Sequence, residues 1–392
     1  MERREFFLTT ALASSRILGA NERLRGGLIG SGGRGRLVAA QFKEIGAEMV
    51  AVCDVYEPNL TEGLKAVNTG AKTYDDYRRL LEDKSLDFVL VATPDHWHAR
   101  MTIDAVESGK DVYVEKPMAH TIAEGFQMIE AVRRTRRVVQ VGTQRRSFDT
   151  FIEAKRIMDS GELGKIELVN SWWLNYQASL NNKALQGKLD WKQWTGSAPA
   201  RELDPMRFFN WYYYWDYSGG LLVGQAAHIV DAINWFMNSK EPLAVTCTGA
   251  RSSLAGAEVP QTASLAIEYP ENYLAVFTLG YRAMKYNTTN DQLKQFHGTK
   301  ARFDVGREGW AIYPQSYAVD MQPSRSFRRP GTFESAVRMH IRNFLGCIKT
   351  RKDPNAPVEA GQATNIVLCM GMDSWRSGRR LKWNPATRKV ES

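Results

Sequence analysis

Three glycines at the spacing Gly30-x-Gly32-x-x-Gly35 follow a short apolar run, and Asp54 ends the next apolar run nineteen residues further on. A glycine turn of this kind lets backbone N–H groups at a helix N-terminus approach a pyrophosphate. A carboxylate at the end of the second strand can accept both hydroxyls of an adenosine ribose. Glycine turns after apolar runs are common, but together with the acid the spacing predicts a dinucleotide site.

The candidate cofactor contacts of this turn are Gly30, Gly32, Gly33, Arg34, Gly35 and Asp54. Val55 and Tyr56 follow the acid, so no arginine or lysine stands beside it to receive a 2′-phosphate. The sequence therefore favours NAD over NADP as the cofactor.

Three further residues are candidates for proton transfer. Lys116 directly follows the apolar run 111–114, and the carboxyl end of a sheet strand is where ligands bind. The alternative for Lys116 is a surface lysine after an edge strand. His228 lies on an apolar helix with Gln225 and Asp231 at i−3 and i+3, which could orient an imidazole or, for Asp231, assist in proton transfer. The alternative for His228 is a core histidine with satisfied hydrogen bonds.

Histidine and cysteine residues do not form a metal motif. His96 and His98 follow a predicted strand without a third converging ligand, so we predict no metal site and expect one of the two to contact the cofactor. The four cysteines are widely separated and lie in apolar surroundings. We expect four buried free thiols.

The elements that must position these residues fall into two domains. Residues 21–146 alternate strand-like and helical segments, including helices at 36–45 and 98–108, which predicts a doubly wound parallel sheet of the Rossmann type. Residues 147–392 contain several strand patterns with hairpin-length gaps, which predict a second α/β domain with an open, mostly antiparallel sheet. The helices expected at 333–349 and 361–375 are candidates for packing back onto the first domain.

An aromatic-rich segment at residues 191–217 follows the first strand of the second domain. Such a segment is often core packed under loops. It is equally compatible with a wall that faces a carbohydrate, because sugar rings stack their C–H faces on aromatic side chains. The sequence leaves both interpretations open.

Composition excludes several classes of protein. With 43% hydrophobic and 24% charged residues, the 392-residue chain is typical of a globular protein with two cores. The formal charge of +9 is spread out, and the arginines at 133–137 lack an interleaved aromatic platform, so we predict no nucleic-acid partner. No run approaches the length of a transmembrane span, so we predict no membrane insertion.

The first twenty residues differ from the rest of the chain. Arg3 and Arg4 precede Phe6, Phe7 and Leu8, which resembles a twin-arginine export signal at residues 1–20. That interpretation predicts a periplasmic protein. The alternative is an amphipathic N-terminal arm on a cytoplasmic protein.

Several segments together resemble the family of glucose-fructose oxidoreductase, inositol dehydrogenase and MocA proteins. They are the glycine turn, TPDHWHA, VEKP, VGTQRR and GGLLVGQAAHIVD. The resemblance implies a Rossmann domain followed by an open-sheet domain, with NAD(P) between them and hydride transfer at a sugar or cyclitol carbon. It implies acid/base positions for Lys116 and His228. It implies cofactor positions for Gly30, Gly32, Gly35, Asp54, Thr93, Pro94, His98, Glu115 and Gln144.

The chain departs from that family at one position. Gly224 stands four residues before His228, where dehydrogenases of the family commonly carry an aspartate. Three functions remain open: an NAD(P)-dependent oxidoreductase of a sugar or cyclitol, an NAD-dependent glycoside hydrolase or lyase that oxidises the ring transiently, and a non-catalytic sugar or dinucleotide sensor. We expect a small carbohydrate as the partner, and a homo-oligomer formed through the open sheet.

Overall fold

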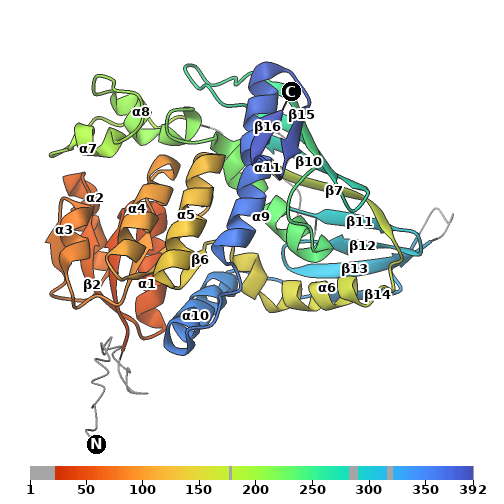
Figure 1. Cartoon of the computed structure of the whole chain (residues 1–392), viewed down its shortest axis with the longest axis horizontal. Coiled ribbons are helices and arrows are strands. Elements are labelled where there is room, and N and C mark those ends of the chain that lie inside the picture. Colours follow the sequence, from red (N-terminus) through yellow and green to blue (C-terminus); the bar gives the residue numbers. More distant parts are fainter. Residues whose placement is uncertain (1–22, 176–178, 282–289, 316–320, 392) are drawn as a thin grey trace, which may run out of the picture.

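The computed structural model describes residues 23–175, 179–281, 290–315 and 321–391. The export signal predicted at residues 1–20 lies outside the described residues. Two sheets organise the described chain, and helices lie between them (Figure 1).

The first sheet contains six parallel strands in the spatial order β3-β2-β1-β4-β5-β6. They are β1 (Arg25–Ile29), β2 (Glu48–Cys53), β3 (Lys72–Tyr74), β4 (Phe88–Val91), β5 (Asp111–Val114) and β6 (Val139–Val141). Strands β4 and β5 are buried at every residue, as expected for a parallel sheet with helices on both faces. The predicted doubly wound parallel sheet is confirmed.

The helices of the first domain follow the strands. They are α1 (Gly33–Glu44), α2 (Glu57–Ala66), α3 (Tyr77–Glu82), α4 (Asp95–Glu107) and α5 (Ile122–Thr135). Helix α1 buries Val38, Ala39 and Phe42, so an apolar stripe at helical spacing faces the sheet. Helices α1 and α4 each begin three residues before the predicted start, and their unpaired N-terminal N–H groups therefore lie directly after a strand end.

Among the described residues, the second sheet contains ten strands in the order β14-β13-β12-β11-β7-β10-β9-β8-β15-β16. They are β7 (Ile166–Asn175), β8 (Ala244–Ala250), β9 (Thr262–Tyr269), β10 (Tyr273–Tyr281), β11 (Lys294–Gly298), β12 (Ala301–Val305), β13 (Gly309–Pro314), β14 (Arg325–Arg328), β15 (Leu381–Asn384) and β16 (Lys389–Glu391). Strands β7 and β10 are parallel and the other described pairs are antiparallel, which confirms an open, mostly antiparallel sheet. Strands β13 to β16 were not predicted, because most are too short to show an alternating pattern.

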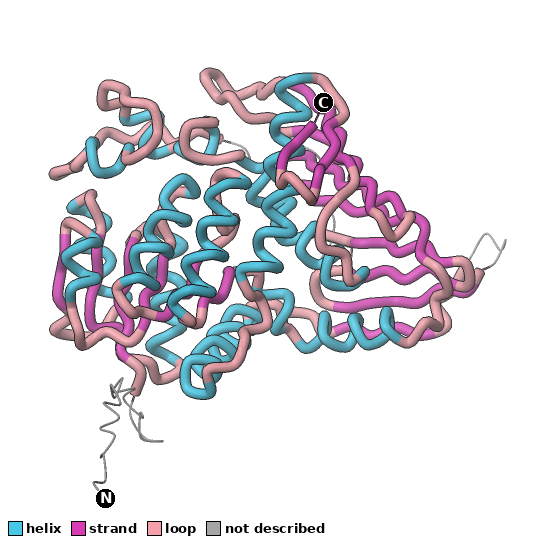
Figure 2. The backbone as a smooth tube through the Cα atoms, viewed as in Figure 1, coloured by secondary structure: helices cyan, strands magenta, loops and turns pink. Residues whose placement is uncertain are grey.

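Helices fill the space between the two sheets (Figure 2). They include η1 (Gln144–Ser147), α9 (Gly220–Met237), α10 (Ser335–Thr350) and α11 (Val358–Ser377). Helix α6 (Asp149–Asp159) packs on η1, α9 and β13. Helix α9 is apolar on almost every side because the second sheet and α11 enclose it. Helix α11 also packs on α5, and the Phe344 ring of α10 lies 5.7 Å from the ring of Phe88 in β4. Both C-terminal helices thus contact the first domain.

A third group of short helices crosses the first domain at the ends of its strands (Figure 1). It comprises α7 (Trp191–Thr195), α8 (Pro205–Phe209) and η2 (Trp211–Tyr213). We call residues 185–217, which contain these helices, the roof.

Three properties of the described residues bear on the excluded classes. All four cysteines are free and buried, as predicted. Within the described ranges no helix is long and apolar enough to cross a membrane. The same ranges hold no group of three or more His, Cys, Asp or Glu side chains placed to hold a metal ion.

Candidate active site

A cavity of about 550 Å³ lies between the first domain and the roof. Its floor is formed by the glycine turn and by the carboxyl ends of β1, β2, β4 and β5, which meet at one edge of the parallel sheet. Helix α9 contributes His228, and the roof contributes several aromatic rings. The volume is typical of a small-molecule or cofactor site.

The glycine turn presents bare backbone to this cavity. Gly30 has φ +87°, and a Cβ there would lie 2.8 Å from the main chain of Ala92, so only glycine fits between the two strands. A Cβ on Gly32 or Gly33 would meet only open space. Helix α1 has no side-chain cap, so its first N–H groups are available to an anion. Gly35 does not line the cavity. A Cβ added at Gly35 would lie 2.0 Å from the Gly30 oxygen, so the lack of a side chain there lets α1 approach β1 closely.

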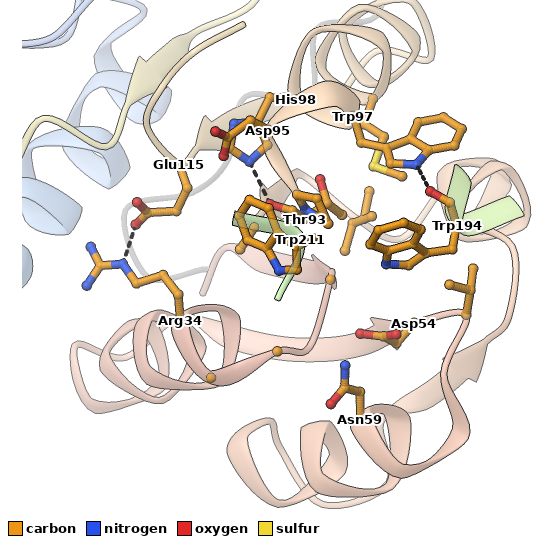
Figure 3. A pocket seen from close by; sticks show the side chains of 18 of the residues that line it. Arg34, Asp54, Asn59, Thr93, Asp95, Trp97, His98, Glu115, Trp194 and Trp211 are labelled. Carbon is orange, nitrogen blue, oxygen red and sulfur yellow. Dashed lines mark hydrogen bonds and ion pairs between the residues drawn. The ribbon is translucent and has the colours of Figure 1, made fainter. Parts of the chain in front are cut away.

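Asp54 lines the cavity at the end of β2, beside Asn59 (Figure 3). Its Oδ2 accepts hydrogen bonds from the Ser31 N–H at 2.8 Å and the Ser31 hydroxyl at 3.2 Å, and its Oδ1 accepts from the Tyr56 N–H at 3.0 Å. Burial raises the pKa of Asp54, and these N–H groups oppose that increase. Each carboxylate oxygen keeps acceptor capacity for a ribose hydroxyl.

Arg34 and Glu115 lie together on one side of the cavity (Figure 3). The Arg34 Nε donates to the Glu115 Oε1 at 2.7 Å, and the Glu115 side chain is almost fully buried. This ion pair links the first turn of α1 to the end of β5. Both predicted cofactor residues are therefore at the cavity, where they contact each other.

Two predicted cofactor residues at the cavity have polar atoms that no described residue satisfies. The Thr93 Oγ1 and the Gln144 Oε1 are buried and have no hydrogen-bond partner in the described chain. A polar ligand in the cavity would supply the partners that these two atoms lack. Pro94, which also lines the cavity, precedes the first residue of α4.

Of the two neighbouring histidines, His98 lines the cavity and His96 does not. The His98 Nδ1 lies 2.6 Å from the Pro117 oxygen and its Nε2 lies 2.9 Å from the Thr93 oxygen (Figure 3). His98 thereby ties the first turn of α4 to the ends of β4 and β5.

Lys116 and His228 are both at the cavity, although more than a hundred residues separate them. The Lys116 Nζ donates to the Gly224 oxygen at 3.2 Å, one helical turn from His228. Burial lowers the pKa of Lys116, and the charges of Glu115 and Asp95 oppose that decrease. Burial, followed by the charge of Lys116, holds the pKa of His228 well below its ordinary value. The His228 Nδ1 is buried without a partner in the described chain.

Asp231 is placed differently from the other candidates. It is 1% exposed, is not part of the cavity wall, and forms an ion pair with the Arg146 Nε at 2.9 Å. The structure therefore brings Lys116 and His228 together at the cavity and holds Asp231 in an ion pair elsewhere on α9. A role of Asp231 in proton transfer stays a prediction.

Asp95 and Tyr212 line the cavity but were not identified from the sequence. The Asp95 Oδ2 accepts from the Ser218 hydroxyl at 2.6 Å, and burial raises the pKa of this carboxyl. Its place in the sequence, directly after a strand end and Pro94, could have indicated it. Tyr212 lies in an aromatic run where no spacing distinguishes one ring from the next.

The roof is tied to the first domain at several points. Leu189 pairs with Tyr56 in a short antiparallel bridge, and the Asp190 N–H donates to the Val55 oxygen at 3.0 Å. The Trp97 Nε1 donates to the Trp194 oxygen at 2.7 Å (Figure 3). These bonds hold the roof across the end of the cavity where Asp54 lies.

The aromatic rings of the roof could form a packed core or a wall that faces a carbohydrate, as the sequence suggested. Trp194 and Phe208 are almost fully buried and pack on Tyr56 and Tyr217 as a small core. Trp194, Phe208, Phe209, Trp211 and Tyr212 also line the cavity. The roof is thus core on one side and cavity wall on the other, and contact with a carbohydrate stays a prediction.

Taken together, the cavity has the features that a dinucleotide needs. The uncapped start of α1 behind Gly32 and Gly33 suits a pyrophosphate, and the fixed carboxylate of Asp54 suits a ribose. The unpaired oxygens of Thr93 and Gln144 suit polar groups near Lys116 and His228.

Two family models match the chain and together cover more than half of it. The model described as "Oxidoreductase family, NAD-binding Rossmann fold" matches residues 24–143. The model of the GFO/IDH/MocA C-terminal domain matches residues 151–304. The first domain is thus an NAD-binding Rossmann domain.

Individual proteins match more locally. The chain is 34% identical over 159 residues to inositol 2-dehydrogenase of Salmonella paratyphi B. The matched segment covers 40% of this chain and 47% of that protein. It is also 37% identical over 127 residues to alpha-N-acetylgalactosaminidase of Shewanella oneidensis. This matched segment covers 30% of this chain and 27% of that protein. The match spans about half the length of the dehydrogenase and about a quarter of the glycosidase.

A solved structure extends the likeness to almost the whole chain. Levoglucosan dehydrogenase in complex with NADH and levoglucosan superposes with a TM-score of 0.73 over 92% of this chain and 99% of that chain, at 17% identity. At this identity the likeness shows that the two chains share a fold.

Proposed function

Because the chain belongs to the GFO/IDH/MocA family of oxidoreductases, we propose that it is an NAD-dependent enzyme that transfers hydride at a ring carbon of a sugar, cyclitol or sugar derivative. One observation carries the proposal: a single cavity joins the glycine turn and Asp54 to Lys116 and His228. The relative named inositol 2-dehydrogenase supports the substrate class.

The residues at the reacting end have two different roles. When bound, NAD supplies a nicotinamide that accepts a hydride from the carbinol carbon of the substrate. Burial holds the pKa of His228 well below its ordinary value, which favours the neutral imidazole, and this neutral side chain is the proposed acceptor of the hydroxyl proton. The Lys116 ammonium then stabilises the negative charge that develops on the substrate oxygen.

The environment of Asp54 supports NAD rather than NADP. Within the described cavity wall, Arg34 and Lys116 are the lysine and arginine residues present, and Arg34 is paired with Glu115. A 2′-phosphate beside Asp54 would therefore face a carboxylate without a neighbouring cation on the wall.

The proposal is tested with the purified full chain. Mass spectrometry of released small molecules should detect NAD, and a panel of cyclitols, sugars and sugar derivatives should yield a ketone product with equimolar NADH. Bound nucleotide without turnover on any member of the panel would instead indicate a sensor, and absence of dinucleotide binding would refute the proposal.

The second candidate is redox-neutral cleavage of a glycoside, in which the ring is oxidised, the aglycone is eliminated and the hydride returns. The local match to an alpha-N-acetylgalactosaminidase and the roof that covers the cavity favour it. In this case a glycoside is cleaved without net change in absorbance of the nicotinamide. Measuring aglycone release and NADH in the same reaction distinguishes the two candidates.

We also propose that residues 1–20 direct twin-arginine export to the periplasm, on the basis of Arg3 and Arg4 before Phe6, Phe7 and Leu8. The full chain should appear in the periplasmic fraction, and an Arg3→Lys, Arg4→Lys double variant should stay in the cytoplasm. Equal distribution of the two forms would indicate an N-terminal arm without an export role.

Finally, we propose that the open face of the second sheet mediates self-association. Leu274 is 37% exposed on β10, on the same face of the sheet as Thr278 further along that strand and Thr262 of β9, which are also exposed. Light scattering should report an oligomer that Leu274→Lys weakens. A monomeric parent chain would refute this proposal.

A further inference from the structure

Gly224 leaves a gap in helix α9, and the phenol ring of Tyr212 fills it. An ideally placed Cβ on residue 224 would lie 1.4 Å from the Tyr212 Oη and 2.5 Å from its Cζ. The hydroxyl from the roof therefore occupies the space into which a side chain at position 224 would project. Tyr212 can occupy this position only because residue 224 has no side chain.

This hydroxyl lies among the groups proposed to act on the substrate oxygen. Lys116 donates to the oxygen of Gly224 itself, and His228 follows four residues later on the same face of α9. Tyr212, Lys116 and His228 all line the cavity. The neighbouring Gln225 does not line it, because its side chain donates to the Tyr281 hydroxyl at 2.8 Å.

The Tyr212 hydroxyl is available as a hydrogen-bond donor. Burial, followed by the charge of Asp95, raises the pKa of Tyr212 well above its ordinary value, so the phenol stays protonated. Its ring makes edge-on contacts with Trp211 and Tyr213. No described residue accepts a hydrogen bond from the hydroxyl.

We propose that Tyr212 contacts the reacting oxygen of the substrate and supplies from the roof the polar group that position 224 lacks. Its hydroxyl donates a hydrogen bond to that oxygen beside Lys116 and His228. The proton stays on Tyr212, and the hydrogen bond strengthens as negative charge develops on the oxygen. This inference rests on the proposed oxidoreductase function.

The first test replaces Tyr212 with phenylalanine, which keeps the ring. We expect Tyr212→Phe to lower kcat by roughly 10- to 100-fold, with a smaller change in KM and unchanged NAD affinity. Tyr213→Phe is the matched control, because this neighbouring tyrosine is outside the cavity wall. Parent-like kcat in Tyr212→Phe would show that the phenol only fills space, and would overturn the proposal.

The second test moves the polar group back to α9. Tyr212→Ala should lose activity as Tyr212→Phe does, and adding Gly224→Asp to it should restore part of kcat, because the carboxyl enters the space that the ring leaves. A merely structural Tyr212 predicts no such restoration. The melting temperature checks the geometry separately: Gly224→Ala should lower it in the parent chain and not in the Tyr212→Ala background.

Failure of this inference differs from failure of the proposed function. A parent chain without turnover on any substrate would overturn both. A parent chain with turnover that Tyr212→Phe retains, or melting temperatures that show no coupling between positions 212 and 224, would overturn this inference alone.

Discussion

The floor and the roof of the cavity are built on different principles. The floor uses backbone N–H groups and short polar side chains at the ends of parallel strands, so the sheet fixes their relative positions. The roof contains no sheet strand of its own and covers the cavity with aromatic rings. Its position depends on a few contacts with the first domain, such as the bond from Trp97 to Trp194.

This difference suggests a division of function. Groups on the floor are charged or hydrogen-bonded in place, so their loss should change affinity or chemistry directly. The roof can open only if its bonds to the first domain break. Loss of one of these bonds should therefore change the rate at which the cofactor enters and leaves.

The largest effect is expected at Lys116, on the floor. Lys116→Met should lower turnover roughly 10²-fold or more, because the developing charge on the substrate oxygen loses its cation, while NAD affinity changes little. Steady-state kinetics and a NAD titration measure both quantities.

Lys110→Met is the matched control, because both lysines flank β5. Lys110 is buried at the other end of the strand, where its Nζ donates to the Asp83 oxygen at 2.8 Å. Equal losses of turnover in the two variants would mean that Lys116 has only a structural role.

The next effect is expected at Asp54. Asp54→Ala should weaken NAD binding by about 1 to 3 kcal/mol, or roughly 5- to 150-fold, because a ribose loses a charged acceptor. Affinity for NADP should fall less, so the preference for NAD should shrink. Ser31→Ala, which removes one hydroxyl bond to Asp54 and keeps the carboxylate, should have a much smaller effect. Equal affinities for NAD and NADP in the parent chain would contradict the role of Asp54.

The floor is also the part that the sequence predicted well. A parallel sheet brings consecutive strand ends to one edge, so the positions of Gly30, Asp54, Thr93 and Lys116 follow from the order of strands and helices alone. His228 was recognisable because burying a polar side chain on an apolar helix costs free energy unless the side chain has a partner or a function. Gly35 shows the limit of a spacing rule, since it packs α1 against β1 and does not face the cavity.

The roof could not be predicted in the same way. Its helices are short, and the rings of Trp194, Phe208 and Tyr212 have no periodicity that separates core from cavity wall. The surroundings of Asp231 could not be predicted for a related reason. Its partner Arg146 belongs to a different element, and only the fold shows that the two side chains pair.

The bond between Trp97 and Trp194 allows a test of the roof. Trp97→Phe keeps a ring and removes the indole donor, which should loosen the roof by about 0.5 to 1.5 kcal/mol and speed NAD release roughly 2- to 12-fold. If the roof limits exchange, association should accelerate as well, which distinguishes opening of the roof from loss of a direct contact. Stopped-flow fluorescence measures both rates.

Trp191→Phe is the matched control for that test. Its indole donates to the Arg201 oxygen at 2.8 Å, within the roof itself, so the bond does not join the domains. NAD exchange in this variant should stay close to that of the parent chain. Equal acceleration in both variants would show that the roof responds to any loss of packing.

The smallest effect concerns His96, which lies where the roof meets the floor. Its ring is 4% exposed, and its Nε2 lies 3.2 Å from the Trp194 oxygen. Burial lowers the pKa of His96 to about 4. Opening of the roof would return the imidazole to water, where its pKa is about 6.5. The closed roof therefore binds fewer protons than the open roof, and its advantage is lost progressively as pH falls from 6.5 towards 4.

We expect NAD release to accelerate by a factor of about 4 at most between about pH 7.5 and pH 6.0. His96→Gln keeps a donor for the Trp194 oxygen but does not titrate, so it should flatten this dependence. His340→Gln is the control, because burial also lowers the pKa of His340 to about 4, but its ring contacts Ser147 and Val141 away from the roof. That variant should alter the pH dependence of the unfolding free energy and leave that of NAD release unchanged. If His96→Gln retained the parent pH dependence, the roof would open without exposing His96, and exchange would proceed through another part of the cavity wall.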